Sequence, residues 1–282
     1  MEIGISGASG QLGQKVSSLL VEHAEEHRFV GISRSPQNVV APLEGRFGDY
    51  NSPDSLKKAY EGLDRLLIIP SADLAPGVRG SQLRAAINAA KHAGVSHVFL
   101  MSAVGTYEEI APSLGEAYWV GEQELIKTVS RWTILRMNYY AESMADEIKM
   151  SLNSGVLAGL GDERVAFVSR DDVAGAAAGA LLGEGHAGAI YNLTGPAAVT
   201  GPDRAAIVSA IVEKPINYIY ITVEQLRAGL ASAGLPEMIL DAMTDIKTGF
   251  IKGKFDIVTG DVERLSHQQP KVLGAVLAAK LV

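Results

Sequence analysis

Short apolar runs alternate with longer amphipathic segments along the first 140 residues of the chain. The apolar runs predict six β-strands, at residues 1–6, 29–33, 46–49, 65–69, 97–102 and 132–136. Segments with helical spacing lie between them, at 12–24, from 52 onward, at 78–92 and at 116–129. Apolar strands that alternate with helices are typical of a parallel sheet covered on both faces. Because such crossovers are right-handed, the sequence predicts a doubly wound α/β fold.

Polar residues and glycines at the segment ends support these boundaries. Ser52 is suited to cap a helix that has Pro53 at its first position. Gly94 is suited to end the helix at 78–92. Further along the chain, Ser169 and Asp172 have the spacing of a capping box in front of an alanine-rich helix.

The pattern is looser after residue 140. Strands are expected at 189–193 and 217–221, helices near 222–232 and 236–248, and an amphipathic helix at 271–282 that docks on the core. No long linker rich in proline, glycine or serine separates the two halves. We therefore predict a domain at 1–150 and a smaller α/β lobe at 151–282, packed together with some chain exchange back to the sheet.

A glycine-rich turn lies directly between the first strand and the first helix. Glycines at positions 7, 10 and 13 leave room for a diphosphate to approach bare backbone, and the N–H groups that open the following helix supply donors. The alternative is an ordinary strand–helix turn, but the position after a strand and before a helix favours dinucleotide binding. The residues expected at the diphosphate are Gly7, Ala8, Ser9, Gly10, Gln11, Leu12 and Gly13.

The end of the second strand predicts which dinucleotide binds. An acidic residue there binds the ribose 2′-hydroxyl of NAD, whereas an arginine accommodates the 2′-phosphate of NADP. The chain has Ser33-Arg34 at this point and no Asp or Glu between Phe29 and Leu43. We therefore expect NADP(H) to be preferred, with NAD as a second possibility. A solvated arginine at a strand end is the alternative interpretation of Arg34.

Composition excludes several classes of function. The chain of 282 residues has a net charge of −7, which argues against a general affinity for nucleic acid or for an anionic membrane. It contains no cysteine, so disulfides, thiolate catalysis and cysteine-ligated metals are excluded. The histidines show no ligand spacing, and no metal site is predicted. We find no leader pattern and no apolar stretch that could span a bilayer, so a soluble, cytoplasmic protein is expected.

Motifs along nearly the whole chain resemble one family, the NmrA-like atypical short-chain dehydrogenases/reductases, which includes quinone and triphenylmethane dye reductases. The matching segments are residues 5–13, 48–51, 66–71, 86–91, 133–136, 169–172, 185–186, 191–193 and 252–253. The resemblance implies an NAD(P)-binding Rossmann domain at 1–150 and a substrate-binding lobe at 151–282. It also implies hydride transfer from a nicotinamide to a quinone-like or dye-like acceptor. Residues at two strand ends then fall near the ribose and nicotinamide: Pro70, Ser71, Ser102 and Ala103.

The chain lacks the Tyr-x-x-x-Lys pair of the wider superfamily, in which the lysine lowers the pKa of the tyrosine. Leu114 stands where the tyrosine is expected and Tyr118 where the lysine is expected. Quinone reduction tolerates this loss, because the hydroquinone anion formed by hydride transfer is stabilised and water can protonate it. Arg136-Met137 also replaces the Arg-Asn of relatives, so the substrate contacts at this edge need not be those of the relatives.

Several polar and aromatic residues are candidates for the chemistry. Tyr118, Ser102 and Tyr140 are the catalytic candidates. The substrate candidates are Tyr107, Trp119, Asn138 and Tyr139, and Tyr139, Tyr140 and Trp119 could form an aromatic wall for a flat acceptor. Packing or a surface position explains each of these residues, taken singly, at least equally well.

The leading hypothesis is an NADPH-dependent reductase whose partner is a small quinone or conjugated aromatic acceptor. The missing Tyr–Lys pair motivates an alternative, a non-catalytic NADP(H)-binding sensor. A tailoring oxidoreductase of aromatic natural products, oxygenation included, is a third possibility. The sequence leaves the acceptor and the oligomeric state open.

Overall fold

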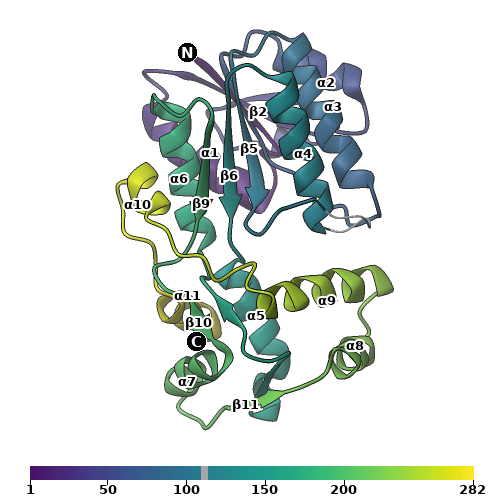
Figure 1. The fold of residues 1–282 in the computed structure, drawn as a ribbon. Coiled ribbons are helices and arrows are strands. Elements are labelled where there is room, and N and C mark those ends of the chain that lie inside the picture. The colour runs from purple at the N-terminus through teal and green to yellow at the C-terminus, as the bar shows by residue number, and fades with distance from the viewer. Residues whose placement is uncertain (109–113) are drawn as a thin grey trace.

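The computed structural model describes residues 1–108 and 114–282. Its centre is a parallel sheet with the strand order β3-β2-β1-β4-β5-β6-β9 (Figure 1). The strands are β1 (Glu2–Ser6), β2 (Arg28–Ser33), β3 (Glu44–Phe47), β4 (Arg65–Ile68), β5 (His97–Ala103), β6 (Trp132–Met137) and β9 (Ala189–Leu193). This sheet confirms the predicted doubly wound α/β fold of Rossmann type. The strand order reverses between β1 and β4, and ligands of such sheets bind in the crevice at the carboxyl ends of these strands.

Helices cover both faces of the sheet and bury two apolar layers. On one face lie α1 (Gln11–Leu20) and α6 (Arg170–Leu182), with α10 (Asp261–Ser266) packed on α6. The other face is covered by α2 (Pro53–Tyr60), α3 (Val78–His92) and α4 (Leu114–Thr128). Short 3-10 turns are η1 (Val21–His23), η2 (Pro36–Asn38) and η3 (Leu152–Ser154).

A smaller lobe lies at the carboxyl edge of the sheet (Figure 1). Its helices are α5 (Ala141–Ser151), α7 (Gly201–Val212), α8 (Val223–Ser232), α9 (Glu237–Ile251) and α11 (Leu273–Leu281). Its strands form two short pairs, β7 (Val156–Gly159) with β11 (Asn217–Tyr220) and β8 (Arg164–Val165) with β10 (Val199–Thr200). The amphipathic tail docks on the lobe core, since Leu273, Val276 and Leu277 are buried.

The chain passes repeatedly between the sheet and the lobe. After α5 and β8 it returns to form α6 and β9, and after α9 it returns again to place α10 on α6. It ends in the lobe with α11. The carboxyl edge of the sheet is therefore held to the lobe by several chain segments. None of the helices in the described ranges has the length and apolarity needed to cross a bilayer.

Several predicted boundaries differ from the structure by a few residues. The third strand is Glu44–Phe47 rather than 46–49, because the chain turns at Asp49: the Ser52 N–H donates to the Asp49 carbonyl at 2.8 Å. The first helix ends at Leu20 and continues as the 3-10 turn η1. By contrast, the Ser169 hydroxyl accepts from the Asp172 N–H at 3.0 Å, as the cap spacing predicts.

Candidate active site

The glycine turn after β1 packs tightly against β2 and α1. Gly7 has φ +93°, and the Gly7 and Ala8 N–H groups donate to the Ile32 carbonyl at 3.0 and 3.2 Å. A Cβ at Gly13 would lie 2.2 Å from the Gly7 carbonyl oxygen. Glycine at position 13 therefore lets α1 begin directly against the turn.

The first turn of α1 has features that fit a diphosphate. Gly10 is its N-cap and offers no side-chain hydrogen bond, and the first turn contains no acidic residue. The N–H groups that open a helix need an acceptor, and they attract negative charge. Gly10 and Gln11 are exposed, whereas Ala8 and Leu12 are buried in the core, so these last two could contribute only backbone to a ligand.

At the end of β2, the buried Ser33 is followed by the exposed Arg34. The Ser33 hydroxyl lies 2.6 Å from the Ser9 hydroxyl and accepts from the Ser35 N–H at 3.0 Å, which ties this strand end to the turn. Arg34 is exposed, and no hydrogen bond or ion pair engages its guanidinium within residues 1–108 and 114–282. Its charge is therefore available to a phosphate group.

The end of β4 carries a hydrogen-bond network. Ser71 donates to the Gln82 side-chain oxygen, and Gln82 donates to the Asn51 side-chain oxygen at 3.1 Å. The Tyr50 hydroxyl donates to the Ile69 carbonyl at 2.7 Å, next to Pro70. Sequence reasoning missed Gln82, because nothing in its helical surroundings marks it as different from other polar positions of the helix.

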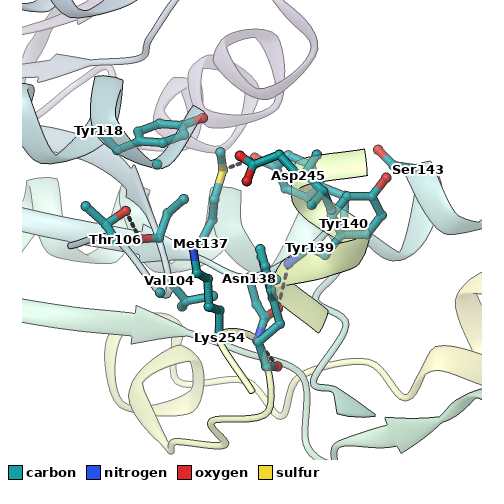
Figure 2. A pocket seen from close by; sticks show the side chains of 16 residues that line it. Val104, Thr106, Tyr118, Met137, Asn138, Tyr139, Tyr140, Ser143, Asp245 and Lys254 are labelled. Carbon is teal, nitrogen blue, oxygen red and sulfur yellow. Dashed lines mark hydrogen bonds between the residues drawn. The ribbon is translucent and has the colours of Figure 1, made fainter. Parts of the chain in front are cut away.

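An aromatic and apolar cavity of about 180 Å³ lies at the carboxyl ends of β5 and β6 (Figure 2). Residues from the strand ends, from α4 and α5 and from α9 with the segment after it line the cavity. They are Ala103, Val104, Gly105, Thr106, Gly115, Tyr118, Met137, Asn138, Tyr139, Tyr140, Ser143, Asp245, Ile246, Gly249, Lys254 and Phe255. The cavity is thus enclosed by the sheet on one side and by the lobe on the other.

Five of the predicted residues line this cavity, namely Ala103, Tyr118, Asn138, Tyr139 and Tyr140. Asn138 is buried and donates to the Phe255 carbonyl at 3.0 Å, while its side-chain oxygen accepts from the Tyr139 N–H at 2.7 Å. This amide therefore ties the end of β6 to the segment that closes the cavity.

The two neighbouring tyrosines are engaged by the protein. The Tyr139 hydroxyl donates to Glu147 at 2.5 Å, and burial together with this carboxylate raises the pKa of Tyr139. The Tyr140 hydroxyl donates to the Met137 sulfur at 2.8 Å, and burial raises the pKa of Tyr140 as well. Arg170 stacks on the Tyr140 ring, 4.6 Å from its centroid. Both phenols are held by structural contacts and favour the neutral form.

Ser102 differs from the expectation of a catalytic or cofactor-contacting group. Its side chain is completely buried, and its hydroxyl donates to Glu122 at 2.5 Å. Glu122 also accepts from the Nε and Nη2 atoms of Arg136, at 2.8 and 2.5 Å. Because successive strand residues face opposite sides of the sheet, Ala103 lines the cavity and Ser102 does not. The Ser102–Glu122–Arg136 cluster joins β5, α4 and β6 beneath it.

Tyr107 and Trp119 also lie outside the cavity lining. Tyr107 is 45% exposed, and the Lys254 ammonium lies 4.3 Å from its ring centroid. Trp119 follows Tyr118 on α4, and one residue of helix turns a side chain by about 100° away from its neighbour. The predicted aromatic wall therefore retains Tyr139 and Tyr140 but not Trp119. The Leu114 side chain, which stands where the superfamily has tyrosine, is not among the described parts.

A second cavity of about 300 Å³ adjoins the first. It lies between the loop before α3 and the helix α9, and Asp245 lines both cavities. No motif in the sequence points to Asp245, Lys254 or Phe255, because they follow β6 by more than one hundred positions and share no pattern with it.

A doubly wound sheet with a glycine turn and a partly open cavity at its carboxyl edge is typical of dinucleotide-binding proteins. Residues 7–183 match the family model described as NAD(P)H-binding. The chain belongs to this family, within the NmrA-like atypical short-chain dehydrogenases/reductases, and it is an NAD(P)H-dependent oxidoreductase.

Individual relatives agree with this assignment. Quinone oxidoreductase 2 of Escherichia coli (strain K12) is 32% identical over 257 residues, which cover 89% of this chain and 88% of that protein. The structure of the NADPH-dependent quinone oxidoreductase from Escherichia coli with NADPH superimposes with a TM-score of 0.92 at 30% identity, covering 99% of this chain and 100% of the other. Triphenylmethane reductase from Citrobacter sp. with NADP(H) gives 0.90 at 27% identity, with 99% of both chains covered.

Proposed function

We propose that this protein is an NADPH-dependent reductase that transfers a hydride to a quinone or a similar conjugated aromatic acceptor. The observation that carries the proposal is the aromatic and apolar cavity at the carboxyl ends of β5 and β6, at the edge where doubly wound sheets bind ligands. Its walls include Met137, Tyr140, Ile246 and Phe255, which offer apolar surface to a flat ring. The names of the quinone and dye reductases among the relatives support the same class of acceptor.

The turn Gly7–Gly13 and Arg34 would hold NADPH, whose nicotinamide supplies the hydride when it is bound. The glycines leave the turn backbone and the first turn of α1 open to the diphosphate. The exposed Arg34, without a protein partner in the described residues, supports a contact with the 2′-phosphate. Ser33 would contribute by fixing the strand end through Ser9.

The chain's own contribution to the chemistry is to position the acceptor and to exclude water. Asn138 fixes the segment around Phe255 over the cavity. The α9 residues Asp245 and Ile246 complete the enclosure, which supports the prediction that residues 151–282 form the substrate-binding lobe. A reactive acceptor held in a defined orientation needs little further activation, because a quinone is already electrophilic.

The test is NADPH consumption, followed by its absorbance, with a panel of quinones and conjugated dyes. A saturated cyclic ketone of matched size is the control, because it needs stronger acid catalysis than a quinone. We expect turnover with several panel members and none with the ketone. The absence of turnover with every quinone and dye would overturn the proposal.

A further inference from the structure

We propose that Tyr118 donates the proton that completes reduction of a carbonyl acceptor, and that Arg79 stabilises the phenolate which this leaves. The inference rests on the proposed function and names the groups that act in it. Arg79 lies in the second position of α3 and reaches Tyr118 on α4. Its Nη1 atom is 3.5 Å from the Tyr118 hydroxyl, and its guanidinium carbon is 5.5 Å from the ring centroid.

Arg79 is a buried cation that no carboxylate of the described residues contacts directly, although Asp73, Asp241 and Asp245 line the same cavity. Its side chain is 8% exposed, its Nε atom has no hydrogen-bond partner, and no carboxylate of residues 1–108 or 114–282 forms an ion pair with it. A buried charge is costly unless it is paired, so its presence here needs an explanation. A phenolate at Tyr118 would supply a negative charge in direct contact. The long contact is compatible with this role, because catalytic hydrogen bonds are often long before the substrate binds.

Tyr118 is also the cavity tyrosine whose hydroxyl no carboxylate or sulfur of residues 1–108 and 114–282 engages. Tyr139 donates to Glu147 and Tyr140 donates to Met137. In the contact between Tyr118 and Arg79, by contrast, the arginine is the donor, which leaves the phenolic proton free for an acceptor oxygen. Figure 2 shows the Tyr118 ring at the border of the cavity, above Met137.

Each member of the pair lines a different cavity. Tyr118 lines the acceptor cavity, whereas Arg79 and Ala117 line the second cavity. A space of about 300 Å³ with carboxylates at Asp73 and Asp241 has room and polar partners for several waters. Tyr118 does not line this second cavity, so solvent returns the proton to the phenolate once the product has left the acceptor cavity.

The proposed step balances in atoms and charge. The acceptor receives a hydride from NADPH and becomes an oxyanion. The O–H bond of Tyr118 breaks, its proton forms the new O–H bond of the product, and the electron pair stays on the phenolic oxygen. The charge of Arg79 compensates this oxygen until solvent water returns a proton.

Two acceptors with different proton requirements separate this role from a structural one. A quinone needs a hydride and a proton, whereas a triarylmethyl cation becomes neutral by accepting the hydride alone. Because water can still protonate the hydroquinone anion, we expect Arg79→Ala and Tyr118→Phe each to slow quinone reduction without abolishing it, lowering kcat by about tenfold, which is less than the usual contribution of general acid catalysis. The kcat for the cationic dye should stay within about twofold, because no proton is transferred in that reaction.

Further variants control for folding. Arg84→Ala removes an exposed arginine from the same helix and should leave both activities unchanged. Arg79→Lys keeps a cation and should recover part of the quinone rate, and guanidinium ion added to Arg79→Ala should do the same. NADPH affinity, measured by calorimetry, should be equal in all variants.

The contrary outcomes are distinct. Equal losses with quinone and dye, or a lower NADPH affinity, would show that Arg79 only supports the fold. An unchanged quinone rate, or failure of both lysine and guanidinium to restore it, would also overturn the inference. If the unmodified protein reduced no acceptor at all, the proposed function itself would fail.

Discussion

The phosphate-binding turn and the acceptor cavity lie at the same edge of one sheet, but the chain builds them in different ways. The turn consists of seven consecutive residues, Gly7–Gly13, and presents mainly backbone. The cavity is assembled from residues near 103–106, 115–118, 137–143 and 245–255, and presents mainly side chains. Local backbone geometry therefore forms the predicted cofactor site, whereas packing between distant segments forms the acceptor cavity. Four predictions test this difference.

The largest effect is expected from Gly13→Ala. Its Cβ would lie 2.2 Å from the Gly7 carbonyl oxygen, so α1 must move away from the turn. We expect a loss of stability of about 3 kcal/mol and a loss of NADPH affinity of about a hundredfold. Thermal unfolding and calorimetric titration measure the two effects. Gly229→Ala on α8 is the control, because a Cβ at Gly229 would have no other atom within 4 Å, and it should stabilise slightly. Normal NADPH binding by Gly13→Ala would contradict the local origin of the cofactor site.

Acid should destabilise the sheet half through His97 at the start of β5. Burial, together with Arg131 and Arg65, lowers the pKa of His97 to about 4 from an ordinary value near 6.5. The unfolded chain therefore binds a proton that the folded chain does not between these values. Stability should fall by about 3 kcal/mol as the pH drops from 6.5 to 4, with no further loss from this group below that.

Tryptophan fluorescence reports this effect, because both tryptophans, Trp119 and Trp132, belong to the sheet half. His97→Gln should flatten the pH dependence, whereas His92→Gln, at an exposed position, should leave it unchanged. The same slope in unmodified protein and His97→Gln would contradict the prediction.

Arg34→Ala should lower the affinity for NADPH and leave the acceptor cavity unchanged. A charge-assisted contact with the 2′-phosphate contributes about 1.5–3 kcal/mol, so NADPH affinity should fall by one to two decades. NADH affinity should change little, since NADH lacks this phosphate. Arg28→Ala, at the opposite end of β2, is the matched control. Equal losses of affinity for the two dinucleotides would show that Arg34 does not contact the 2′-phosphate.

Asn138→Ala should produce the smallest effect and should affect the acceptor alone. It removes the hydrogen bond to the Phe255 carbonyl, which still accepts from the Ala166 N–H at 2.9 Å, and the hydrogen bond from the Tyr139 N–H to the Asn138 side-chain oxygen. We expect a loss of about 1 kcal/mol in stability and an increase in the acceptor KM of about fivefold. NADPH affinity should not change. Asn153→Ala, at an exposed position in η3, provides the control. A parallel decrease in NADPH affinity would mean that the two sites are not separable.

The same contrast explains what the sequence could predict. The helix at 78–92 and the strand at 189–193 match α3 and β9 at both ends, because apolar spacing and a terminal glycine or turn define them locally. The third strand lies two residues earlier than predicted. Its bounds are set by pairing with β2, in which Glu44 takes part and Asp49 does not, and the local sequence does not show this pairing. The position of Ser102 at a strand end predicts a place in the cavity, but the pleat turns it toward Glu122. No pattern in the neighbouring sequence marks Arg79 as part of the site, because the residue that it contacts, Tyr118, lies on another helix.

The repeated passage of the chain between sheet and lobe has a consequence for biosynthesis. β6 pairs with β5 on one side and with β9 on the other, and more than fifty residues separate β6 from β9 in the chain. During translation, β6 is therefore the outer strand of an incomplete sheet until residues 189–193 have left the ribosome. An uncovered apolar outer strand is a template for pairing between neighbouring chains. We expect nascent chains halted before residue 189 to form insoluble aggregates, which sedimentation after arrested translation would reveal.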